Sequence, residues 1–240
     1  MLLDHIRYEL RIIGRWILLI PLLIVAGLVL LTIFLSAMKV DHVRLSQILT
    51  ASLEMLLPLA TGVMVATFVS PDHAIELQLT FPRMYRVTAF LRLLLMSCWT
   101  GCVAAISSVF LYHWKYLRIP AVINAWGAIP QVFVEQLTWL APLSWLVSVG
   151  LCIALLTRSR TASSAILAGI WIAEAVFYGY FIYTSWLQPL FLFPTTLAPY
   201  ITFWFTNRYI VLGTALVFFV LGWLLLHNTE ALLQGTAGEE

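Results

Sequence analysis

Two acidic residues lie inside long apolar stretches, where a carboxylate is costly and therefore informative. Glu54 lies in the run from Ile48 to Val69, and Glu174 lies near the middle of a run that begins at Thr161. A charged side chain at the centre of a bilayer costs about 3 kcal/mol, so it usually faces a cavity or pairs with another group. Each acid could therefore accept a cationic or hydroxyl-bearing ligand. The alternative is a hydrogen bond to a Ser, Thr, Tyr or Trp side chain of a neighbouring helix.

Aromatic and sulfur-containing side chains give weaker indications of a site. Tyr178 and Tyr180 belong to an aromatic run in the same stretch as Glu174. They could line a pocket for an apolar ligand, or they could simply pack against neighbouring helices. None of the five histidines is central in an apolar run, and the three cysteines are interpreted as buried free thiols. We expect no metal site and no cofactor bound by this chain.

Composition indicates that the elements positioning these residues are membrane helices. Of 240 residues, 62% are hydrophobic and 10% are charged, and the mean hydropathy is +0.97. Soluble domains contain about 45–50% apolar and about 25% charged residues, so the expected solvent is a lipid bilayer. The net charge of +2 favours neither an acidic partner nor nucleic acid.

Apolar stretches of about 20 residues can cross a bilayer as helices. Six spans are predicted, at 16–38, 48–69, 89–112, 136–157, 161–184 and 209–227. The 13 Lys and Arg residues divide eight to five between the two sides, with the larger number on the side of both termini and Arg208 on the opposite side. Because cytoplasmic loops are enriched in basic residues, both termini are expected in the cytoplasm, with the chain as a multi-pass protein of the cell (plasma or inner) membrane.

Two further segments are not simple spans. In residues 1–15 the apolar positions recur at helical spacing, which predicts an amphipathic helix in the membrane interface. Residues 185–207 are apolar and aromatic but carry Pro189, Pro194 and Pro199, which are too dense for a straight helix. We expect short broken helices that dip into the outer leaflet as a re-entrant segment packed against the bundle. The predicted fold is an all-α polytopic membrane protein with one transmembrane domain over residues 1–240.

The one densely charged interior stretch lies between the second and third spans. Asp72 could cap a short helix there, and Pro82 should end it. Such a helix, within residues 72–86, is either a docking surface for a cytoplasmic partner or a plain connection between spans. The residues that would form the docking surface are Asp72, Glu76, Leu77, Leu79, Pro82, Arg83, Arg86 and Arg92.

The run from Glu76 to Pro82, Glu-Leu-Gln-Leu-Thr-Phe-Pro, resembles the E-L-L-L-S-x-P run of permeases of the ABC-2 family, which also falls between spans two and three. A basic residue ten positions beyond the proline recurs in that family, and here it is Arg92. The layout of nearly the whole chain is similar as well. Residues 70–75 depart from the family pattern, because they lack the R-E-x-G-T sequence that often precedes the glutamate.

The resemblance implies that residues 72–86 form a coupling helix that docks in a groove of a cytoplasmic ATPase subunit. It also implies a dimer with a second permease, identical or different, and two copies of the ATPase. ATP and Mg²⁺ would be bound by that partner, since this chain has no phosphate-binding loop of the G-x-x-x-x-G-K-[ST] type. The expected activity is export of a hydrophobic or amphipathic substrate, with Glu54, Glu174, Tyr178 and Tyr180 as candidates for the substrate path.

Three other functions remain open at this point. A sensory or assembly subunit would dock a partner without moving a substrate. A secondary carrier could use Glu174 as a proton relay, although carriers of that kind often contain internal repeats and none is found here. A membrane hydrolase is disfavoured because the sequence contains neither a G-x-S-x-G nor an H-E-x-x-H motif. We therefore do not expect this chain to be an enzyme by itself.

Overall fold

The computed structural model describes residues 15–69 and 85–226, and every regular element in those ranges is a helix. The first part contains α2 (Arg15–Ala37), α3 (His42–Ala51), a π-helical turn η1 (Ser52–Leu56) and α4 (Leu57–Val69). The second part begins with α6 (Tyr85–His113), η2 (Ala121–Ile123), α7 (Ala128–Glu135), α8 (Leu137–Thr157) and α9 (Arg160–Val176). It ends with α10 (Tyr178–Tyr183), η3 (Gln188–Leu190), α11 (Pro194–Leu197) and α12 (Trp204–Leu225).

Five stretches are long and apolar enough to cross a membrane among the residues described: Leu18–Ala37, His42–Phe68, Ala89–His113, Ala128–Thr157 and Trp204–Leu225. The prediction of an all-α polytopic membrane protein is thus confirmed at this coarser level. The predicted span 161–184 is not among the five, because α9 is only 17 residues long and α10 begins separately after Phe177. Three other stretches begin before their predicted starts, since α3, α7 and the first turn of α12 extend them.

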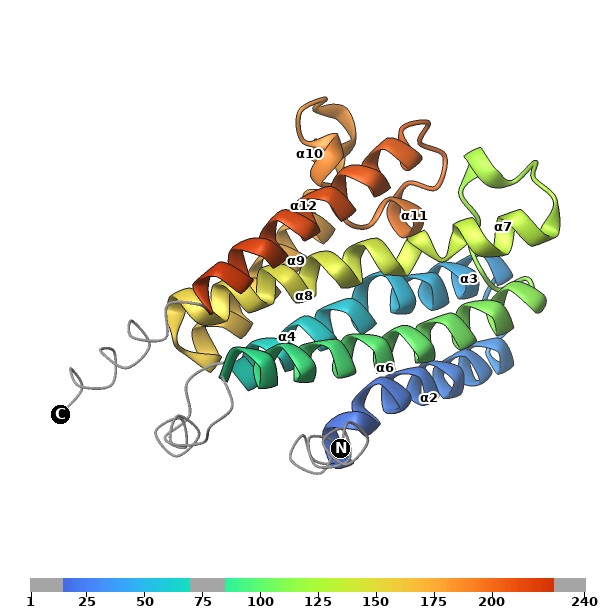
Figure 1. Cartoon of the computed structure of the whole chain (residues 1–240). Coiled ribbons are helices and arrows are strands. Elements are labelled where there is room, and N and C mark those ends of the chain that lie inside the picture. The colour runs from blue at the N-terminus through green and yellow to red at the C-terminus, as the bar shows by residue number, and fades with distance from the viewer. Residues whose placement is uncertain (1–14, 70–84, 227–240) are drawn as a thin grey trace.

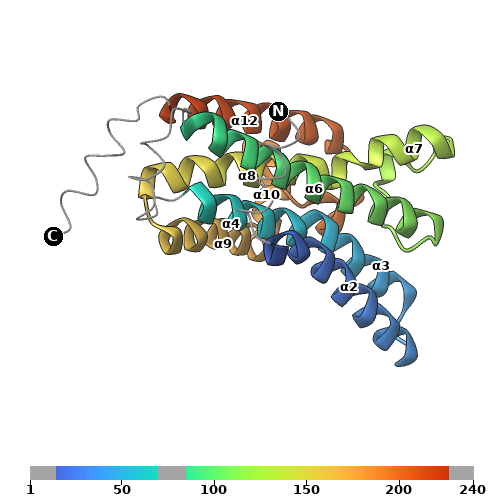
Figure 2. The same cartoon turned by 60° about the horizontal axis from the view of Figure 1, so that its bottom comes forward.

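Helix α8 forms the centre of the bundle, between α12 on one side and α4 on the other (Figures 1 and 2). In an apolar run of 18 residues within each of the stretches that include α4 and α8, 67% of residues are buried, whereas in the corresponding run of α2 only 6% are. A helix that is apolar all round and yet exposed is stable only in lipid. Helix α2 therefore lies at the periphery of the bundle with most of its surface available to the bilayer.

Two glycines allow α4 and α8 to approach backbone to backbone. A Cβ added to Gly62 would lie 2.9 Å from the carbonyl oxygen of Leu146, and one added to Gly150 would lie 2.9 Å from the carbonyl oxygen of Gly62. Small residues are the usual means by which membrane helices pack closely, because lipid provides no hydrophobic drive for their association. The close contact between α4 and α8 therefore requires glycine at both positions.

The short turn expected between the fourth and fifth predicted spans is present. Arg158 ends α8 in the left-handed conformation with φ of 52°, which turns the chain sharply. Ser159 then caps α9, because its hydroxyl oxygen accepts a hydrogen bond from the Ala162 N–H. In Figure 1 this turn lies at the same end of the bundle as the start of α2, the end of α4, the start of α6 and the end of α12.

The proline-rich segment before α12 forms short helical pieces joined by irregular backbone, as expected. Its central residues, from Phe191 to Thr196, are buried against the bundle. Residues 204–207, which the predicted segment included, belong instead to the first turn of α12. The backbone N–H and C=O groups of this buried irregular segment therefore need hydrogen-bond partners from other parts of the fold.

Candidate functional site

Glu54 lies in the π-helical turn that joins α3 to α4. Pro58 accounts for this turn, because proline has no N–H to donate to the carbonyl four residues earlier and its ring clashes with that carbonyl. The Leu57 N–H instead bonds to the Ser52 carbonyl, five residues back. Turns of this kind change the direction in which a side chain points, and they recur at functional sites. The Glu54 side chain is completely buried.

Both carboxylate oxygens of Glu54 are held by the segment that precedes α12. Oε1 accepts the Thr195 N–H at 3.1 Å, and Oε2 accepts the Thr196 N–H at 2.6 Å. These two N–H groups belong to the first turn of α11, where helical N–H groups have no partner within the helix. Arg208 of α12 completes the carboxylate's surroundings by donating from Nη2 to Oε1 in a buried ion pair.

The Arg208 guanidinium makes further contacts that fix its position. Nη1 donates to the Leu192 carbonyl at 2.9 Å, and Nη2 donates to the Thr195 hydroxyl at 3.1 Å. The guanidinium carbon lies 5.5 Å from the centre of the Trp204 ring, one helical turn earlier, in a cation–π contact. Trp204 in turn donates its indole N–H to the Thr195 hydroxyl at 3.0 Å. Arg208 is thus a cation with no exposed surface and several partners.

Glu174 joins the same cluster from α9 and is only 5% exposed. Its Oε2 accepts the Leu192 N–H at 2.8 Å, while the Leu192 carbonyl accepts from Arg208. One backbone residue therefore connects the acid of α9 to the cation of α12. Beside it, the Asn207 amide donates to the carbonyls of Gln188 and Phe191, each at 2.8 Å.

These contacts satisfy irregular backbone that would otherwise be unstable at membrane depth. Unpaired N–H and C=O groups cost several kcal/mol in hydrocarbon, so non-helical backbone survives there only where protein covers and bonds it. Glu54, Glu174, Asn207 and Arg208 supply those bonds to residues 188–196. We call these four side chains the buried network. Its hydrogen bonds attach the proline-rich segment to η1, α9 and α12.

The structure brings together only some of the residues predicted for the substrate path. Glu54 and Glu174 share the buried network, and both are sealed from the surroundings of the bundle. Tyr178 and Tyr180 lie on α10 with exposed fractions of 42% and 70%, outside the buried interior that holds the acids. Among the alternatives for the acids, hydrogen bonding within the bundle is realised. The partners, however, are backbone N–H groups and an arginine rather than the side chains expected. Assignment of all four residues to a substrate path stays a prediction.

Sequence reasoning missed two groups in the buried interior. Arg208 was placed among the basic residues of an outer loop, but it lies within α12 and is completely buried, because Glu54 needs a cation. Its position directly before an apolar stretch is that of an ordinary loop residue and gave no distinguishing signal. Glu135, which directly precedes the predicted span 136–157, is 1% exposed at the end of α7. Around the α7–α8 junction, side-chain hydrogen bonds join Gln136 to Ser108, Glu135 and Trp139, and a separate bond joins Tyr112 to Gln131.

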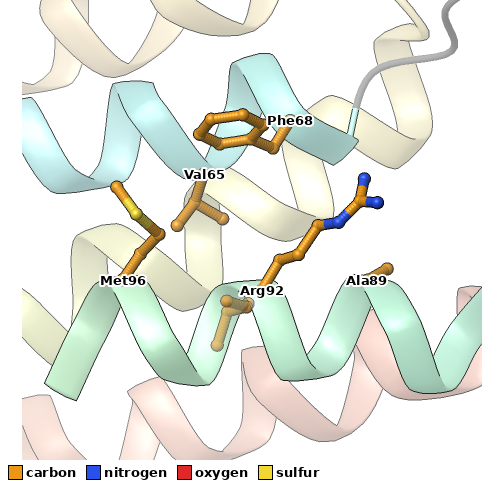
Figure 3. A pocket seen from close by; sticks show the side chains of 6 residues that line it. Val65, Phe68, Ala89, Arg92 and Met96 are labelled. Carbon is orange, nitrogen blue, oxygen red and sulfur yellow. The ribbon is translucent and has the colours of Figure 1, made fainter. Parts of the chain in front are cut away.

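Most of the predicted coupling residues lie outside the described ranges, namely Asp72, Glu76, Leu77, Leu79, Pro82 and Arg83. Arg86 falls in the first turn of α6. Arg92, also on α6, lines a small cavity with Val65 and Phe68 of α4 and with three other residues of α6. Figure 3 shows its guanidinium directed toward the C-terminal end of α4. A cation is favourable there because the carbonyls at that end carry partial negative charge.

Comparison of the sequence with models of protein families finds no match, and neither the curated proteins nor the solved structures include a match to this chain.

Proposed function

We propose that this chain is the membrane-spanning permease subunit of an ATP-driven transporter of the ABC-2 type. It would export a hydrophobic or amphipathic substrate with energy from a separate ATPase. The observation that carries the proposal is the run from Glu76 to Pro82, followed by Arg92, in the connection between α4 and α6. In support, this connection joins two helix ends that lie at the same end of the bundle as the start of α2 and the end of α12 (Figure 1).

The proposal includes a topology finer than the five apolar stretches. Helices α9 and α10 together would form a sixth crossing, with the break at Phe177 inside the membrane. Residues 185–203 would be the re-entrant segment in the outer leaflet, and their burial and side-chain hydrogen bonds support that placement. The end of the bundle where α4 ends and α6 begins would face the cytoplasm.

The proposed mechanism is a rocking motion driven from the cytoplasmic side. ATP would close a dimer of ATPase subunits, and the coupling helices of two permeases would be drawn together with it. The bundles would then open a central path outward. In this scheme Glu76, Arg83 and Arg86 form the polar part of the partner surface, while Leu77 and Leu79 anchor the helix. The buried network would keep the outer segment attached to its own bundle during the motion.

The direct test is co-purification with a candidate ATPase in mild detergent, followed by measurement of ATP hydrolysis. We expect the ATPase to remain bound to the wild-type chain, and the double variant Glu76→Lys, Pro82→Ala to lose binding or stimulated hydrolysis. Arg44→Glu is the matched control, because Arg44 is an exposed charge in the first turn of α3, and α3 begins at the opposite end of the bundle. A double variant that keeps both binding and stimulated hydrolysis would remove residues 72–86 as the coupling helix.

A sensory or assembly subunit would give a different result in the same system. It would bind the ATPase through the same surface, but reconstituted vesicles would show no ATP-dependent movement of hydrophobic or amphipathic test compounds. Transport assays on vesicles that contain both subunits therefore separate the two functions after binding is established.

A further inference from the structure

A groove of about 450 Å³ lies between α6, α8 and α12, away from the buried network. Trp139, Leu143 and Val147 of α8 are buried and form its floor, while Leu94 of α6 and Leu216 of α12 are exposed at its rim. Figures 1 and 2 both show α6 and α12 converging toward one end of the bundle and separating toward the other.

The groove is closed where α6 and α12 converge. Phe90 of α6 packs edge-on against Phe219 and Trp223 of α12, each with ring centres 5.3 Å apart. The two helices separate beyond these rings, and the space between them opens to the membrane side of the bundle. The groove is therefore produced by the helix arrangement and not by a chance gap between side chains.

Its dimensions match a hydrocarbon chain. From Leu93 to Gly101 the α6 wall extends about 12 Å at 1.5 Å per residue. This is close to one leaflet of a bilayer whose hydrocarbon core is about 30 Å thick. A helix about 10 Å wide fills about 400 Å³ in every turn of 5.4 Å. The groove thus holds little more than one turn of a partner helix, whereas its volume is typical of a small-molecule site.

The chemistry of the lining also favours hydrocarbon. The hydroxyls of Ser144 and Ser148 donate to carbonyls of their own helix, at 2.8 Å and 3.0 Å, so neither is free to bind a polar ligand. Ser97 is the one groove serine whose hydroxyl has no hydrogen-bond partner within the described residues. A lone hydroxyl in an otherwise apolar groove does not form a polar recognition site.

We propose that this groove binds one acyl chain of a bilayer phospholipid, lying along α6 and α12 over the floor made by α8. The site would distinguish this lipid from the lipids that merely surround the bundle. It does not depend on the transport function proposed above.

The experiment uses the full chain in nanodiscs that contain a small fraction of phosphatidylcholine with a diazirine in one acyl chain. Samples are irradiated before or after transfer to lipid-free detergent and washing, and crosslinked residues are identified by mass spectrometry. We expect groove residues such as Leu94 and Cys98 still to be crosslinked when irradiation follows washing; we call these the persistent crosslinks. Leu23 and Leu30 of α2 are 61% and 67% exposed and contact only surrounding lipid, so they should be crosslinked before washing but not after it.

Two glycine variants provide a matched pair. A Cβ at Gly101 would make an ordinary contact with the Trp139 ring at 3.6 Å, so Gly101→Leu should fold and fill the groove. Gly169→Leu on α9 has open space around it and serves as the control. Gly101→Leu should reduce the persistent crosslinks about tenfold because it displaces the buried apolar contact, and Gly169→Leu should not. Ser97→Ala should leave them unchanged.

Three results would overturn the proposal. If the groove held no lipid of its own, crosslinking by irradiation after washing would fall to the same extent at the groove and at α2. Lipid crosslinks at the groove that appear in nanodiscs holding one chain and disappear in nanodiscs holding two would identify a protein interface instead. A large loss in Ser97→Ala would require a polar ligand group and would exclude a plain acyl chain. The comparison within the wild-type protein remains decisive even if Gly101→Leu fails to fold.

Discussion

The pairing of Glu54 with Arg208 is the most consequential feature at the scale of single residues. Each removes the charge penalty of the other, and together they bond the backbone of residues 192–196. Removing one partner of a buried ion pair leaves the other unpaired in a region without water, which is why such substitutions cost more than the pair itself contributes.

We therefore expect Glu54→Gln to destabilise the protein by about 3–5 kcal/mol, because it leaves Arg208 buried and uncompensated. The measurement is the fraction of protein that stays folded after heating in detergent, followed by size-exclusion chromatography. Arg44→Gln, which neutralises an exposed residue, is the control and should change little. The double variant Glu54→Leu, Arg208→Leu should be less damaging than the sum of the two single variants. Equal behaviour of Glu54→Gln and Arg44→Gln would refute the structural importance of the pair.

Sequence could identify the acids of this site but not their partners. A carboxylate within an apolar stretch is costly wherever it lies, so Glu54 and Glu174 were recognisable as special from composition alone. Arg208 was not, because a basic residue beside a span is the ordinary pattern of a membrane loop. The main partners of both acids, backbone N–H groups of residues 192–196, leave no trace in residue type.

At the scale of elements, we expect opposite effects of substitution at two glycines, one inside the contact between α4 and α8 and one outside it. Gly62→Ala should destabilise the protein by about 1–3 kcal/mol, because its Cβ would overlap the Leu146 carbonyl oxygen and force the helices apart. Gly213→Ala on α12 has open space and should be neutral or stabilising by up to about 1 kcal/mol through helix propensity. Thermal unfolding of both variants in the same detergent is the measurement. A stabilising effect of both would show that α4 and α8 separate without cost.

The helices themselves follow closely from the sequence, but their interruptions do so less well. Apolar runs located the main spans, and dense prolines correctly indicated broken structure before α12. The π-helical turn at Glu54 depends on how one missing N–H, at Pro58, is accommodated, and the period of apolar residues is too coarse to reveal it. The end of α9 at Val176 likewise falls inside a continuous apolar run that gave no stop signal.

At the scale of the whole molecule, the sequence indicated which connections share one end of the bundle. Alternation of spans predicts that the start of the first span, the loop after the second, the turn after the fourth and the end of the last lie on one side. In Figure 1 the end of α4, the start of α6, the α8–α9 turn and the end of α12 lie at one end of the bundle. The central position of α8 was not predictable, since all spans are similarly apolar. It depends on which helices carry small residues on facing surfaces, and a single sequence does not pair those surfaces.

The orientation of the bundle in the membrane can be tested by labelling exposed residues at its two ends. In a variant without native cysteines, Arg44→Cys and Thr161→Cys would each place one thiol at an exposed position, and the two positions lie at opposite ends. Because the sequence assigns eight of the 13 basic residues to the side of the turn that precedes Thr161, this end should face the cytoplasm. A membrane-impermeant maleimide added to intact cells should label Arg44→Cys and should reach Thr161→Cys only after the cells are opened. The reverse pattern would place the connection between α4 and α6 outside the cell, where no ATPase could reach it, and the proposed function would fail with the orientation.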